Sequence, residues 1–175
     1  MRSVYRKKNS RGDSMDVKGY LDYMMESNHG PVLKAIDGVT EEESLERGRD
    51  NTNHIRWITG HLLGSTGMAV KLLKGQTSYP QEWNQLFIRG AEFSEDPSVY
   101  PSMEDLRVNL KQAYSELRAA VNKCEIEYLE TEREIFPGWT TTPAKAVMFL
   151  LRHEFYHMGQ IATLRRILGR ERLFG

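Results

Sequence analysis

Residues 142–169 read TPAKAVMFLLRHEFYHMGQIATLRRILG. Thr142 followed by Pro143 is typical of a helix start, because threonine caps and proline fits the first helical position. Arg165 and Arg166 suit a helix C-terminus, and Gly169 is typical of the residue that follows one. Spacings of three and four place one set of residues on a single face: Ala146, Leu150, His153, His157, Gln160, Leu164 and Ile167. Two histidines and a glutamine therefore occupy positions where a packed helix normally carries apolar residues.

Three further segments carry the same helical periodicity. The first follows Asp16 and ends near Gly38, the second begins within 51–53 and ends at Gly75, and the third follows the cap Ser102. The sequence contains little strand signal. Four helices with narrow apolar stripes predict an all-α fold, a four-helix bundle.

The segment between the second and third helices, residues 76–101, is too long for a hairpin connection. A crossover of this length lets the third helix run parallel to the second, so we expect an up-down-down-up order. The segment contains five large aromatic residues, so we expect it to pack against the helices: Tyr79, Trp83, Phe87, Phe93 and Tyr100.

The second helix contains Gly60, Gly64 and Gly67 in its interior. An interior glycine costs up to about 1 kcal/mol relative to alanine. We therefore expect a neighbouring backbone to pack closely against this helix.

The composition indicates one soluble domain. The chain has 175 residues and a formal net charge of zero, with 24 basic and 24 acidic residues, so we expect neither nucleic acid nor a membrane as a partner. Cys124 is the single cysteine, which favours a cytoplasmic location. Residues 1–15 are basic and form a separate extension, with a presequence as the alternative, and residues 16–175 form the bundle domain.

His153 and His157 are four residues apart, so their rings lie on one face of the helix and can bind one ion. His61 lies on the apolar stripe of the second helix. Three imidazoles from two facing helices would form a site with open positions, which is typical of catalytic metal sites. The alternative is a set of core histidines with hydrogen-bond partners. Gln160, one turn after His157, could orient a ligand ring or a bound water.

The pattern H-E-x-x-H is also the signature of zinc peptidases. The extended form of that signature needs glycine at Gln160 and histidine at Thr163, and both requirements fail. The other form needs a glutamate on a later helix, but Glu171 lies beyond the expected helix end. We therefore do not expect a peptidase. Glu154 lies about 80° around the helix from the two rings. It stays a catalytic candidate, but we favour a surface or inter-helix salt bridge.

The segments NHIRWITGHLLG, residues 53–64, and HEFYHMGQIATLRRILG, residues 153–169, resemble the DinB/YfiT-like superfamily of metal-dependent enzymes. The resemblance implies an up-down-down-up bundle, a homodimer, and a divalent metal on His61, His153 and His157. His54 departs from the family pattern. It is either a further ligand or proton shuttle, or a helix-end histidine near solvent, and we favour the latter.

The resemblance also implies a reaction class. Relatives include thiol S-transferases and a thiol-dependent isomerase. We therefore expect a metal-dependent enzyme, a thiol S-transferase that joins a low-molecular-weight thiol to a small electrophile. Zinc or nickel is the expected metal, and iron and manganese are the alternatives. The alternative functions are a hydrolase or isomerase with the same site, and a metal-binding protein without turnover.

Overall fold

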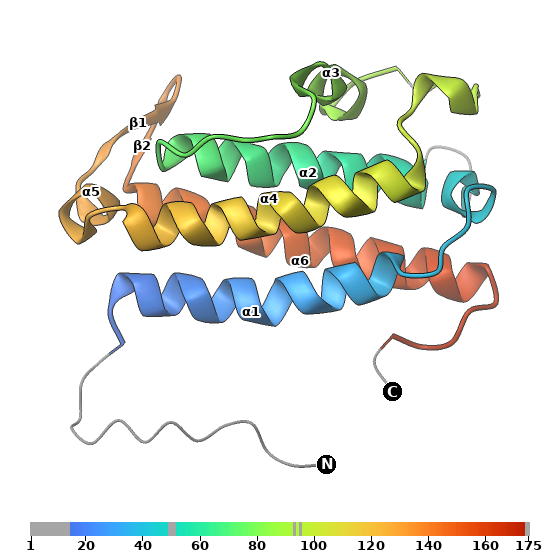
Figure 1. The fold of residues 1–175 in the computed structure, drawn as a ribbon, viewed down its shortest axis with the longest axis horizontal. Helices are drawn as coiled ribbons and strands as arrows, with labels where there is room; N and C mark the ends of the chain where they lie inside the picture. Colours follow the sequence, from blue (N-terminus) through green and yellow to red (C-terminus); the bar gives the residue numbers. More distant parts are fainter. Residues whose placement is uncertain (1–14, 49–51, 93, 95, 174–175) are drawn as a thin grey trace, which may run out of the picture.

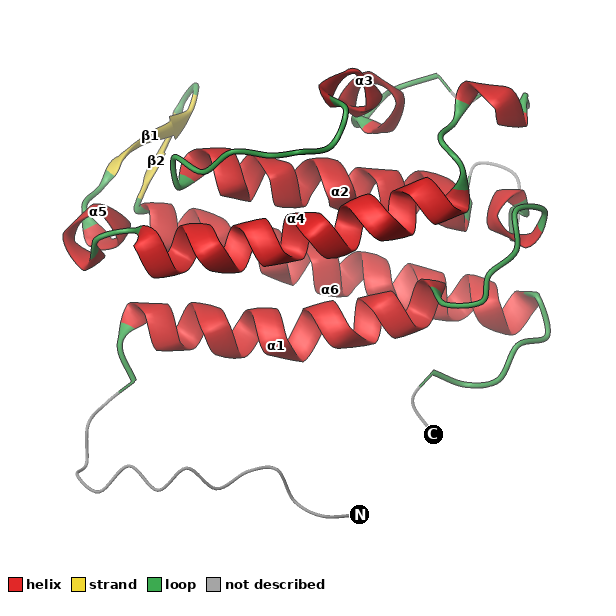
Figure 2. Cartoon of the chain, in the orientation of Figure 1, coloured by secondary structure: helices red, strands yellow, loops and turns green. Residues whose placement is uncertain are grey.

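The computed structural model describes residues 15–48, 52–92, 94 and 96–173. The described chain is mostly helical, as the sequence predicts (Figure 2). Four long helices account for most of it: α1 (Val17–Ile36), α2 (Ile55–Leu72), α4 (Met103–Lys123) and α6 (Pro143–Ile167). Residues 1–14 of the predicted basic extension lie outside the described residues.

The long helices lie side by side (Figure 1). Helix α2 packs against α4 and α6, and α1 packs against α6 and α4. Helices α1 and α6 run in one direction along the long axis, and α2 and α4 run in the other (Figure 1). The face of α1 that packs against the other helices is buried and includes the polar residue Asn28.

The predicted caps are present at three helix starts. The Asp16 carboxylate accepts a hydrogen bond from the Gly19 amide at 2.8 Å. Ser102 accepts one from the Asp105 amide, and Thr142 accepts one from the Lys145 amide. These side chains satisfy amides that the first turn of a helix leaves without partners.

A small antiparallel sheet departs from the all-α expectation. Strands β1 (Arg133–Phe136) and β2 (Trp139–Thr141) form a hairpin after the short helix α5 (Ile126–Glu130). Gly138 adopts a φ of 78° in the turn, which glycine accepts without steric cost. The Pro137-Gly138 pair was the available sequence signal for this turn.

The described part of the crossover packs onto α2, as the aromatic content predicts. It contains 3₁₀ turns at Gln81–Trp83 and Pro97–Val99 and the short helix α3 (Asn84–Phe87). Tyr79, Phe87 and Tyr100 are buried, whereas Phe93 lies outside the described residues.

The glycines of α2 are explained by side chains and not by a neighbouring backbone. A Cβ at Gly60 would overlap the ring of Phe87, and a Cβ at Gly67 would overlap Tyr79. The expectation of backbone packing was wrong because the crossover inserts aromatic rings where α2 has no side chain.

His54 is the N-cap of α2 and is fully buried, so the expectation of a position near solvent was wrong. Its Nδ1 accepts a hydrogen bond from the Trp57 amide at 2.9 Å. Burial lowers the pKa of His54 to about 4, and the positive charges of Arg56 and Arg47 act in the same direction. The neutral ring is therefore the form that caps the helix.

We expect His54 to make the folded state sensitive to acid. A folded-state pKa below the ordinary value of 6.5 means that the unfolded chain binds the proton more tightly, so stability falls as pH decreases from 6.5 to about 4. His54→Asn keeps a capping side chain without a titrating ring. Between pH 6.5 and about 4, the variant should lose about 2 kcal/mol less stability than the wild type, as measured by thermal unfolding. Equal pH dependence in the two proteins would contradict this role.

Candidate metal centre

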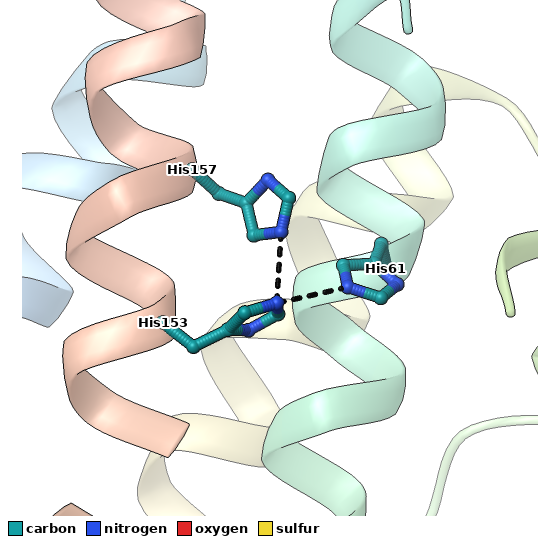
Figure 3. A group of neighbouring side chains, drawn as sticks. All are labelled: His61, His153 and His157. Carbon is teal, nitrogen blue, oxygen red and sulfur yellow. Dashed lines mark hydrogen bonds between the residues drawn. The ribbon is translucent and has the colours of Figure 1, made fainter. Parts of the chain in front are cut away.

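Three imidazole rings from two helices meet between α2 and α6 (Figure 3). His61 comes from α2, and His153 and His157 come from successive turns of α6. The Nε2 atom of His153 lies 3.4 Å from Nε2 of His61 and 3.0 Å from Nε2 of His157. One ligand atom from each ring lies within 4.8 Å of the other two. The structure thus brings together the three residues that the sequence selected.

Two of the rings are held through their other nitrogen. Nδ1 of His61 lies 2.7 Å from the carbonyl oxygen of Phe87. Nδ1 of His157 lies 2.7 Å from Oε1 of Gln160, whose Nε2 donates to the Tyr156 hydroxyl at 3.1 Å. Because a carbonyl oxygen can only accept, Nδ1 carries the proton in both rings, and Nε2 of His61 and His157 presents a lone pair.

Burial keeps the rings neutral. It lowers the pKa of His157 to about 4, although the hydrogen bond with Gln160 opposes the shift. Burial also lowers the pKa of His61 and of His153. The neutral imidazole is the form that binds a metal ion.

The nitrogen arrangement fits a divalent cation. A proton on Nε2 of His153 can be donated to only one of the two neighbouring Nε2 atoms. Hydrogen bonding among the rings therefore leaves the lone pair of the other Nε2 atom without a donor. A cation accepts all three lone pairs together. Zinc–imidazole bonds of about 2.0–2.1 Å at tetrahedral angles place two ligand nitrogens about 3.3 Å apart. Two of the Nε2 separations, 3.4 Å and 3.0 Å, are close to that value, and all three ligand atoms lie within 4.8 Å of one another.

The crossover contributes to this arrangement through Phe87. Its ring occupies the space over Gly60, and its carbonyl oxygen binds His61. The indole of Trp57 stacks on the His61 ring, with the two ring centroids 4.9 Å apart and an interplanar angle of 11°. Neither contact with His61 follows from the helical periodicity of the sequence. The glycine at position 60 was the signal for the first of them.

Glu154 does not join the three rings. It is buried, so the interpretation as a surface residue was wrong. Its Oε2 lies 3.9 Å from Nε2 of His29 on α1. The His29 ring stacks on Tyr114 of α4 with centroids 3.7 Å apart. An inter-helix contact is therefore present. Burial raises the pKa of Glu154 to about 7 and lowers the pKa of His29 to about 3, so the two do not form a charged pair at neutral pH.

Two other polar residues lie elsewhere. His54 is not part of the imidazole cluster, because it caps the start of α2. The Asn28 amide donates to the Leu151 carbonyl at 2.6 Å and so connects α1 to α6.

Comparison with known proteins agrees with the helical fold. The family model of the DinB superfamily matches residues 25–161, which is more than half of the chain. The chain therefore belongs to the DinB superfamily. A search of the curated proteins finds no match.

Similar solved structures include two DinB-like proteins and one conserved protein. The protein from Bacillus cereus has 17% identity and a TM-score of 0.64, covering 89% of this chain and 94% of that one. The Enterococcus faecalis protein has 12% identity and a TM-score of 0.69, covering 90% and 100%. The Bacillus subtilis protein has 15% identity and a TM-score of 0.64, covering 87% and 93%. At these identities the similarity is one of fold.

Gly60 gives a test of how the crossover positions His61. We expect Gly60→Ala to displace Phe87 and to destabilise the protein by about 1–3 kcal/mol, because the added methyl group overlaps a buried ring. Gly159→Ala in α6 is the control, since no atom lies within 4 Å of its added Cβ. The control should stabilise the helix by roughly 0.5–1 kcal/mol. Chemical denaturation measures both changes, and equal effects of the two substitutions would exclude a steric requirement at position 60.

Proposed function

We propose that this chain is a metal-dependent enzyme with a divalent ion bound by His61, His153 and His157. The observation that carries the proposal is the convergence of three neutral imidazoles, two of which have Nδ1 engaged by carbonyl oxygens. A divalent ion on three histidines lowers the pKa of a bound water or thiol and so supplies a nucleophile near neutral pH. Zinc or nickel suits this donor set, with iron or manganese as alternatives.

Within this proposal the reaction is the transfer of a small thiol to an electrophile. The family resemblance supports this class, and the open side of His61 toward a cavity supports a site that admits small molecules. A hydrolase or isomerase with the same site is the second candidate, and a metal-binding protein without turnover is the third.

The two catalytic candidates have different proposed roles. Gln160 orients His157 through the hydrogen bond at Nδ1, and Tyr156 holds the Gln160 amide. Glu154 faces a space of about 10 Å³ that can hold about one water molecule. We therefore assign Glu154 to the contacts among α1, α4 and α6 and not to the substrate.

We also propose a fold, a location and an oligomeric state for this protein. The directions and packing of α1, α2, α4 and α6 support an up-down-down-up four-helix bundle in one domain, residues 16–175, after a basic extension, residues 1–15. The neutral charge and the single cysteine support a cytoplasmic protein without a nucleic-acid partner, and the family resemblance supports a homodimer. No described helix is long and apolar enough to cross a membrane.

Metal content tests the site. Protein purified without a histidine tag should contain about one divalent ion per chain, and His153→Ala should lose most of it, because two imidazoles bind far more weakly than three. Elemental analysis after dialysis measures the content. His54→Asn is the matched control, since it also removes one histidine but leaves the cluster intact. A low metal content that is the same in all three proteins would reject the site.

Turnover tests the reaction class. The metal-loaded protein should accelerate the conjugation of a low-molecular-weight thiol to a model electrophile, and His61→Ala should abolish the acceleration. Loss of free thiol measures the rate, and His54→Asn should retain it. Hydrolysis of an ester panel without any thiol would favour the second candidate. Metal binding with no turnover in either assay would favour the third.

A further inference from the structure

A cavity of about 620 Å³ adjoins His61 on the side of the crossover. It lies between α2 and the segment that contains α3, and its volume is within the range of small-molecule pockets, about 300–1,000 Å³. Tyr79, Asn84 and Phe87 from the crossover form one wall, and His61, Gly64 and Met68 from α2 contribute to the other. The docking of the crossover on the glycines of α2 therefore also shapes this space.

Much of the lining is apolar. Met68 is 43% exposed and Ile88 is 48% exposed, although both are large hydrophobic residues, and both line the cavity with Phe87. Apolar surface that remains in contact with water at a concave site is typical of a binding site for an apolar group.

Two cations complete the lining. Lys71 of α2 and Arg89 of the crossover border the cavity, and no described lining residue is acidic. The Lys71 ammonium donates to the neutral amide oxygen of Gln81. Arg89 has no ion pair or hydrogen bond from its side chain within the described ranges. The positive charges are therefore not compensated by described carboxylates, and an anionic group that enters the cavity is attracted to them.

We propose that this cavity binds a small amphipathic carboxylate, whose carboxylate is attracted to the cations Lys71 and Arg89 and whose apolar chain lies against Met68, Phe87 and Ile88.

The inference goes beyond the proposed function and does not depend on it. Binding of the anion itself depends on the cavity and its two cations, so it is expected in metal-free protein as well.

Octanoate is the probe, with octylammonium and 1-octanol as probes of equal chain length and different charge. In protein labelled with [methyl-13C]methionine, the Met68 signal is identified with Met68→Leu. Titration of chelator-treated protein with octanoate should shift this signal. We expect octylammonium to bind at least tenfold more weakly, and the double variant Lys71→Gln/Arg89→Gln to bind octanoate about tenfold more weakly than the wild type. Raised salt should weaken octanoate binding more than octanol binding.

The control is Lys111→Gln/Lys145→Gln, which removes the same charge from exposed positions outside the cavity. It should bind octanoate as the wild type does. Three results would each overturn the inference: equal binding of octanoate and octylammonium, no shift at Met68, or an equal effect of the two double variants. Octanoate binding in a protein that takes up no metal would sustain the inference while the proposed function fails. Metal uptake without any shift of the Met68 signal would sustain the proposed function while this inference fails.

Discussion

Imidazole nitrogens that are shielded from water need partners, and this requirement organises the contact between α2 and α6. Nδ1 of His61 and of His157 each meets a carbonyl oxygen, one from the crossover and one from Gln160. These two hydrogen bonds fix the tautomers, so the Nε2 lone pairs face Nε2 of His153. A cluster of lone pairs with at most one shared proton is unfavourable in a partly buried site, and a divalent cation would satisfy all three of them.

The crossover connects the cluster to the rest of the fold. Glycine at positions 60 and 67 removes side chains from one face of α2, and Phe87 and Tyr79 occupy the space. The same contact that buries the Phe87 ring places its carbonyl oxygen at His61, and the same segment closes the cavity beside that ring. Packing of the crossover, orientation of a proposed metal ligand and the shape of a binding space are therefore consequences of one set of contacts.

Glu154 illustrates how a motif depends on its surroundings. In H-E-x-x-H the two histidines share a face, and the intervening glutamate lies around the helix from them. Here that direction points into the packing of α1 and α4, where Glu154 meets His29 and the ring stack with Tyr114. Burial raises the pKa of the carboxyl group to about 7, so the environment and not the motif decides its chemical form.

The sequence by itself determined the long helices, their capping residues Asp16, Ser102 and Thr142, and the set His61, His153 and His157, because periodicity and capping depend on local spacing. It also indicated that the crossover packs down, from its aromatic content. Only the tertiary structure decided that Phe87 supplies the carbonyl for His61, that His54 is buried, and that Glu154 turns away from the rings. The small hairpin at 133–141 was likewise not predicted, because its strands are too short to establish an alternating pattern of apolar and polar residues. Contacts between residues distant in sequence are set by how helices and crossover pack, and that information is absent from the spacing of residues along one element.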